Sequence, residues 1–258
     1  GLRSGYSVPT SSGSLSVSTS DAGLSGVSGG MDVQSGKATG GDSGSISVFT
    51  GQAVGGKAGM IGMAVGSGDT GSGGAFSMVA GETTDISSGG DIGLRSGYSV
   101  PTSSGSLSVS TSDAGLSGVS GDVLIQSGKS TMGDSGSIRV ESQTAISGKG
   151  GSLAFQVSEG TTNDGGSILM SAGATTAKGR KGGAIVLEAG TAANVAGSSE
   201  HHGGKVALIG GHGHGGADDD TGGVVDMKGG SSRSGSGGSI IMKSGSGSSS
   251  SSGNIVIE

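Results

Sequence analysis

A short apolar pattern recurs sixteen times along the chain, at a nearly constant step over most of its length. The copies follow, with variation, the form Gly-Gly/Ser-x-apolar-x-apolar-x-small-Gly, in which the two apolar residues are two positions apart. Side chains at positions i and i+2 of an extended backbone lie on the same side. The pattern therefore predicts sixteen short extended segments, each with one apolar face. The first apolar residues are Leu15, Met31, Ile46, Ile61, Phe76, Ile92, Leu107, Val123, Ile138, Leu153, Ile168, Ile185, Val206, Val225, Ile240 and Ile255.

The sequence also has a longer repeat, which contains several copies of the short apolar pattern. Residues 1–29 return unchanged at 93–121, and the copies stay in register to give an internal duplication of 1–92 as 93–184. Six short steps make one such block. The steps lengthen from Ile168 onward and remain long as far as Val225, which predicts added loops within 185–225. We expect a single continuous repeat domain over residues 1–258.

The composition excludes several classes of protein. The 258 residues include 62 glycines and 53 serines but no Cys and no Trp, so an ordinary compact core is not expected. Glycine at this frequency is incompatible with helices of ordinary length. The absence of Cys excludes disulfide scaffolds and thiolate zinc sites, and no apolar run approaches the roughly 20 residues of a membrane span. With 14 Lys and Arg against 20 Asp and Glu, nucleic-acid binding is not expected.

The spacing predicts an all-β fold, a narrow two-sided parallel β-solenoid with coils of about 15 residues, about 16 of them stacked in a rod. Mostly β-branched residues stand eight positions after the first apolar residue and predict a second, shorter strand in each coil. They are Thr39, Val54, Thr84, Val100, Thr131, Ile146, Thr161 and Thr176. Opposite charges one short step apart, Asp42 with Lys57 and Asp134 with Lys149, fit neighbouring coils. A stack of antiparallel strand-turn-strand units and a disordered Gly/Ser tract are the alternatives.

Candidate chemistry is confined to the lengthened repeats, which contain all four histidines. His212, His214, Asp218 and Asp220 are candidate ligands for zinc or a similar ion, because imidazole and carboxylate bind such metals. The competing interpretation is an exposed loop without a role, and we expect no metal, no other cofactor and no catalytic residues. A calcium β-roll is not supported, since Asp does not recur every nine residues, and Thr is not aligned as in ice-binding solenoids.

The repeats GGSILMSAG, GGAIVLEAG and GGSIIMKSG resemble the Gly/Ser-rich β-solenoid repeats of extracellular structural and surface proteins of algae and microbes. The resemblance implies a self-assembling, non-enzymatic structural subunit of an extracellular or cell-surface filament, with a rigid stalk of a surface adhesin as the alternative. Because Gly1–Gly5 and Gly253–Glu258 are parts of the same repeat, we expect head-to-tail polymerisation through open solenoid ends. The Ser and Thr residues offer many sites for O-linked glycans, whereas no Asn-x-Ser/Thr acceptor is present.

Overall fold

The computed structural model describes residues 1–8, 10–192, 202–215, 220–247 and 251–258. Among these residues there is no helix and no β-strand, so the parts of the chain are named by residue ranges. No helix capable of crossing a membrane is found in this part of the chain. The chain divides into two units, Gly1–Ile125 and Gln126–Glu258.

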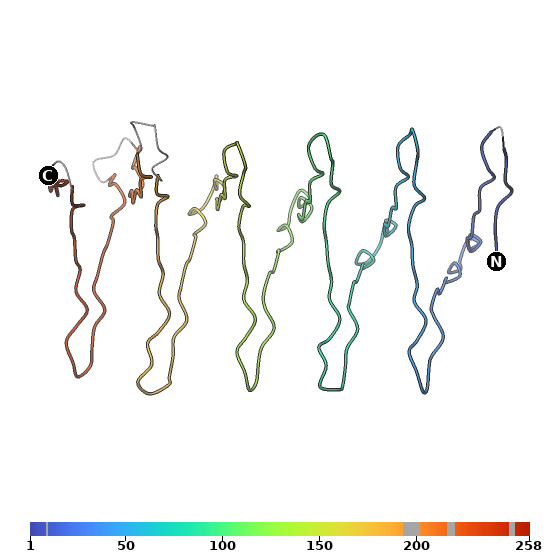
Figure 1. Ribbon diagram of the computed structural model, residues 1–258, viewed down its shortest axis with the longest axis horizontal. Coiled ribbons are helices and arrows are strands. Elements are labelled where there is room, and N and C mark those ends of the chain that lie inside the picture. Colours follow the sequence, from blue (N-terminus) through green and yellow to red (C-terminus); the bar gives the residue numbers. More distant parts are fainter. Residues whose placement is uncertain (9, 193–201, 216–219, 248–250) are drawn as a thin grey trace. The chain divides into compact units, whose positions relative to one another are not determined.

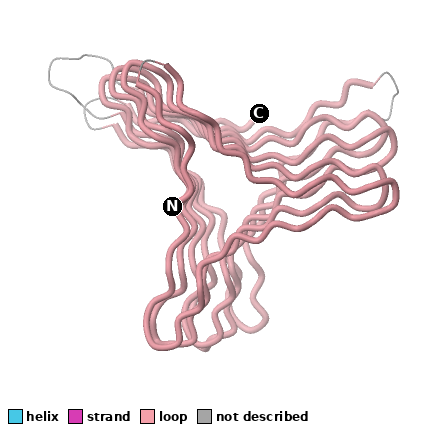
Figure 2. Tube along the Cα trace, turned by 90° about the vertical axis from the view of Figure 1, so that its right-hand side faces the viewer, coloured by secondary structure: helices cyan, strands magenta, loops and turns pink. Residues whose placement is uncertain are grey.

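Within each unit the chain runs outward to a bend and back again, repeatedly, in extended arms (Figure 1). Figure 2 colours the described chain as loops and turns throughout, in agreement with the absence of helices and strands among these residues. The bends and turns include 24–25, 39–41, 54–56, 69–72, 84–87, 100–102, 116–118, 131–133, 146–148, 161–163, 177–179 and 233–235. They recur once per repeat, and the apolar pairs lie between them.

Backbone hydrogen bonds close many of these arms at their base. In each case the N–H of a glycine that precedes an apolar pair donates to the carbonyl of a glycine that follows the previous pair, at 2.8 to 3.0 Å. We call this contact the neck of an arm. The donor and acceptor pairs are Gly13 and Gly5, Gly90 and Gly81, Gly105 and Gly97, Gly183 and Gly173, Gly204 and Gly190, Gly223 and Gly211, Gly238 and Gly230, and Gly253 and Gly245.

The stretch between successive necks has a constant length. Where two necks close neighbouring arms, the donor glycine of one and the acceptor glycine of the next are seven positions apart, as in Gly90 and Gly97, Gly183 and Gly190, Gly204 and Gly211, Gly223 and Gly230, and Gly238 and Gly245. We call the stretch from such a donor glycine to the next acceptor glycine a segment, for example 183–190. Each segment contains one apolar pair.

Among these neighbouring necks, the variation in repeat length therefore falls within the arms. Gly190 and Gly204 are fourteen positions apart and Gly211 and Gly223 are twelve apart, against eight for Gly230 and Gly238. The additional residues of the lengthened repeats lie between closed necks, and the segments on either side keep their length. Length is tolerated there because closing a longer loop adds little entropy.

The predicted parallel β-solenoid is wrong. A stacked coil requires hydrogen-bond ladders between residues one full repeat apart, whereas the backbone bonds of the described residues join glycines eight to fourteen positions apart across a neck, apart from one turn. A single bond at a neck does not make a strand pair. Asp42 and Lys57, expected on neighbouring coils, form no ion pair, and neither do Asp134 and Lys149; the pairs found in the described chain are Arg139 with Glu141 and Lys228 with Asp226.

The predicted second strand is wrong as well. Its residues fall at or beside the bends, where the chain reverses direction: Val54 opens the bend 54–56 and Ile146 opens the bend 146–148. These two residues keep 94% and 93% of their surface exposed. The residues predicted to form the second strand therefore lie at or beside the arm tips. No neighbouring strand pairs with them there, so their preference for extended backbone does not produce a strand.

Hydroxyl side chains and glycines shape the tips. Ser130 Oγ accepts from the N–H of Gly133, and Ser232 Oγ accepts from the N–H of Gly235, each at 3.0 Å. Serine side chains satisfy backbone donors in turns in this way. The tip 177–180 is a turn in which Arg180 N–H donates to Ala177 O at 3.2 Å, with Gly179 at a φ of +72°. Glycine is favoured there because it adopts positive φ without steric cost.

The chain has no buried side chain among its described residues. Its accessible surface is 25617 Å². A globular protein of 24.0 kDa would expose about 10,000 Å² and its unfolded chain about 35,000 Å². The observed area is closer to the unfolded value, so the fold of one chain leaves most of its surface in contact with solvent.

Candidate functional site

Glycine occupies the position two residues before the first apolar residue in all sixteen repeats. In the structure this glycine faces a residue near the end of the preceding extended stretch, in most repeats a small one, both where a neck bond is present and where it is not. A methyl group in place of an α-hydrogen of Gly183 would lie 3.4 Å from Ala172 Cβ and 3.2 Å from Gly173 N. The facing pairs are Gly13–Ser4, Gly29–Thr19, Gly44–Ser35, Gly59–Thr50, Gly74–Val65, Gly90–Ala80, Gly105–Ser96, Gly121–Thr111, Gly136–Ser127, Gly151–Ser142, Gly166–Val157, Gly183–Ala172, Gly204–Ala189 and Gly253–Ser244.

Two necks of the C-terminal unit contain glycine on both sides. Gly223 faces Gly211, and Gly238 faces Gly230, with the methyl position 3.1 Å from the opposing backbone nitrogen in each. The neck glycines are the structural residues that the sequence interpretation missed. Their signal was present in the sequence as the one glycine common to all sixteen repeats.

Amide hydrogen exchange tests the necks. The N–H groups of the eight donor glycines should exchange about 2- to 10-fold more slowly than those of Gly36 and Gly51, since one net hydrogen bond contributes about 0.5–1.5 kcal/mol. Gly36 and Gly51 are suitable controls because they stand at corresponding segment ends and donate none of these bonds. Exchange at Gly183 and Gly204 as fast as at Gly36 would show that the necks are not closed in solution.

The apolar pairs form the least exposed row of large apolar residues. First apolar residues range from 48% exposed at Ile61 to 62% at Leu107, whereas tip residues such as Leu116 reach 111%. This row, the sixteen first apolar residues, is called the apolar row below. Its residues are about half exposed in both units. A half-exposed apolar row of this regularity is an incomplete hydrophobic contact.

Successive apolar pairs come close to one another. Phe155 of one segment and Ile168, Leu169 and Met170 of the next line a shared surface hollow, most of whose lining is apolar. A second hollow lies at the neck of the arm 97–105, where Arg95, Tyr98 and Ser104 contribute to its wall. The first hollow brings the apolar pairs of two successive segments together, although it does not close into a core.

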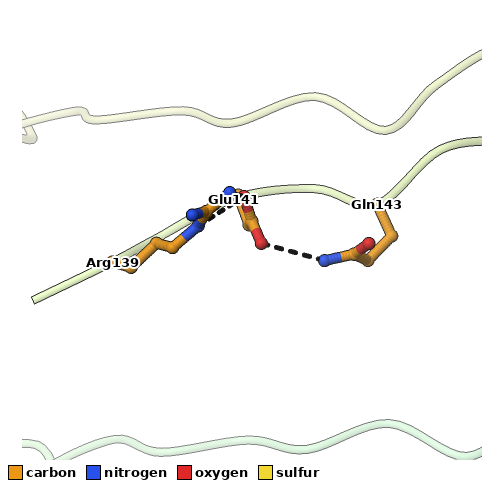
Figure 3. A network of polar contacts seen from close by, with 3 residues as sticks. All are labelled: Arg139, Glu141 and Gln143. Carbon is orange, nitrogen blue, oxygen red and sulfur yellow. Dashed lines mark hydrogen bonds and ion pairs between the residues drawn. The ribbon is translucent and has the colours of Figure 1, made fainter.

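The opposite side of the segment that contains Ile138 and Val140 is polar. Arg139 and Glu141 form an ion pair, with Arg139 Nε donating to Glu141 Oε2 at 2.7 Å, and Gln143 Nε2 donates to Glu141 Oε1 at 3.0 Å (Figure 3). These side chains alternate along the backbone with Ile138 and Val140, so the predicted period of two is present in the geometry. Arg139 is 80% exposed at its side chain, and such pairs contribute under about 1 kcal/mol.

The candidate metal ligands lie in one arm. His212, His214 and Asp220 all belong to the arm closed by Gly211 and Gly223, and Asp218 lies outside the described residues. The rings of His212 and His214 are neighbours, with centroids 5.9 Å apart and planes tilted by 36°. The described residues contain no cluster of three or more His, Cys, Asp or Glu side chains placed to hold a metal ion.

Comparison with known proteins found no match: no protein-family model, no curated protein sequence and no solved structure is similar to this chain.

Proposed function

We propose that this chain is a structural subunit of an extracellular or cell-surface filament that assembles from further copies of itself. The observation that carries the proposal is the apolar row, which recurs in every repeat and remains about half exposed in a single chain. Hydrophobic stabilisation is roughly proportional to the apolar area removed from water. A chain that leaves this row open gains little from folding alone and gains more when another surface covers it.

A second copy of the chain is the partner that fits best. It presents the same row with the same spacing, so apolar residues of two copies can meet in register along the chain. The net charge of −6 over 258 residues is small, and repulsion between copies is correspondingly weak. Because the stacked solenoid is wrong, its open coil ends are not the assembly surface, and the apolar row takes that place.

The extracellular location and the O-linked glycans belong to the proposal through the resemblance of the repeats to extracellular Gly/Ser-rich proteins. The tips support glycosylation in one respect, because they expose many hydroxyls. Two of these hydroxyls already have a partner: Ser7 and Ser99 each contact a threonine hydroxyl three residues on, at 2.9 Å, in the two copies of the duplicated block. An intact mass above the 24.0 kDa of the unmodified chain would indicate glycans on native material.

A stalk that carries a binding domain is less well supported. A stalk must be stiff as a single chain, and stiffness requires buried contacts or hydrogen-bond ladders. The described residues contain neither a buried core nor a strand. Assembly supplies the missing contacts and is therefore preferred.

Sedimentation velocity over a concentration series, with negative-stain imaging of the same samples, tests the proposal. We expect mass to increase with concentration and filaments of uniform width to form. Assembly should persist at high NaCl concentration and strengthen in ammonium sulfate, since salt screens charges while sulfate favours apolar burial. A chain that remains monomeric in every condition would rule out the filament, and isolated short rods would favour the stalk.

A further inference from the structure

The arm closed by Gly211 and Gly223 carries a pair of histidines whose placement follows from its glycines. Gly211, Gly213 and Gly215 alternate with His212 and His214. Methyl groups built on Gly213 and Gly215 would collide with the returning chain, at the Thr221 carbonyl and the Asp220 carboxylate respectively. The glycines thus permit close approach of the two halves of the arm. The intervening histidines share one side of the outgoing half, where their rings are neighbours.

We propose that His212 and His214 form a two-imidazole chelate for a late first-row divalent metal ion. Both residues are exposed, so a metal reaches them directly and water completes its coordination. Metal–nitrogen bonds of about 2.0–2.1 Å place two ligand nitrogens about 3–4 Å apart. Rings with centroids 5.9 Å apart on one side of an extended backbone reach that separation by side-chain rotation. Cu²⁺ should bind most tightly and Zn²⁺ less so, following the usual order for nitrogen sites.

Because the neck is closed, His212 and His214 can bind one metal ion together instead of acting as two independent ligands. The Gly223 N–H to Gly211 O bond, 2.8 Å long, anchors the backbone immediately before His212. On either side of His214, the returning chain lies so close to Gly213 and Gly215 that neither position has room for a side chain. Once one imidazole binds a metal, the second is present at high effective concentration. The proposal concerns this arm alone and does not depend on filament assembly.

Titration of the full chain with CuCl₂, followed by calorimetry and electron paramagnetic resonance, tests the site. We expect one tight equivalent of Cu²⁺ with two coordinated nitrogens, and ZnCl₂ should compete for it. His212→Ala and His214→Ala should each weaken the affinity at least about tenfold, through loss of the chelate. His202→Ala, in the preceding long arm, should leave the affinity unchanged.

A rearranged variant separates geometry from composition. Gly211→His combined with His212→Gly keeps four histidines and the net charge, but puts the pair at positions of opposite parity, on opposite sides of the backbone. Position 211 has room for a side chain, with no atom within 4 Å of a methyl group built there. This variant should bind Cu²⁺ as weakly as His214→Ala. Affinity equal to that of the native chain, or an unchanged affinity in His212→Ala, would overturn the proposal whether or not filaments form.

Discussion

Replacing three residues of the apolar row by aspartate should abolish filament assembly. Ile92→Asp, Ile138→Asp and Ile168→Asp place charges at positions that are 54 to 55% exposed in one chain and that become covered when copies meet. Burying an unpaired carboxylate in an apolar contact costs several kcal/mol, so three of them should raise the assembly concentration by at least about a hundredfold. Sedimentation velocity at fixed protein concentration measures the change.

The matched control places the same charges at arm tips. Ile86→Asp, Leu116→Asp and Ile146→Asp add the same three negative charges at residues that are 102%, 111% and 93% exposed. This variant should assemble like the native chain. Amide exchange at the neck glycines should be native-like in both triple variants, which distinguishes lost assembly from a lost fold. Equal loss of assembly in both would show that net charge, and not the apolar row, governs association.

Shortening an arm should leave the necks and assembly unchanged, whereas shortening a segment should disrupt the necks. Deletion of residues 194–199 reduces the separation of Gly190 and Gly204 from fourteen positions to eight, the value found at the arm of Gly230 and Gly238. We expect the Gly204 amide to keep its slow exchange and assembly to be unchanged. The reason is that arm length varies among the repeats while the necks on either side remain closed.

Deletion of Val186 alone should be the damaging change, although it removes one residue instead of six. It brings Ile185 and Leu187 next to each other, on opposite sides of the extended backbone, and changes the constant step between Gly183 and Gly190. Slow exchange should be lost at Gly183 and Gly204, by about the full factor of 2 to 10 that one hydrogen bond supplies. Retained protection there would show that segment length is not what positions the necks.

The chain divides into segments of constant length and arms of variable length. The sequence predicted the apolar side of the segments, but it did not predict the arms. The spacing of Ile138 and Val140 correctly predicted one apolar side, because the alternation of side chains along an extended backbone is a local property. The ion pair of Arg139 and Glu141 on the other side confirms it. The neighbouring rings of His212 and His214 follow the same rule.

The candidate site was accessible from the sequence in part. Placing His212 and His214 on one side required nothing beyond their spacing. That both lie in an arm whose neck is closed by Gly211 and Gly223 required the structure. The neck glycines were missed because the chain contains 62 glycines. Nothing in the sequence distinguishes a neck glycine from the others until its hydrogen-bond partner is known.

By itself the sequence determined the repeat, its apolar pairs, the absence of cysteine chemistry and the exclusion of ordinary helices, all of which follow from composition and from backbone geometry over a few residues. The tertiary structure alone decided which parts of the chain meet. A repeat of this length is equally compatible with a coil stacked on its neighbour and with an arm closed on itself, since both return the apolar pair to the same place in the pattern. The choice depends on contacts between residues that are not neighbours in the chain, such as Gly183 with Gly173, and these left the apolar row half open for a partner to cover.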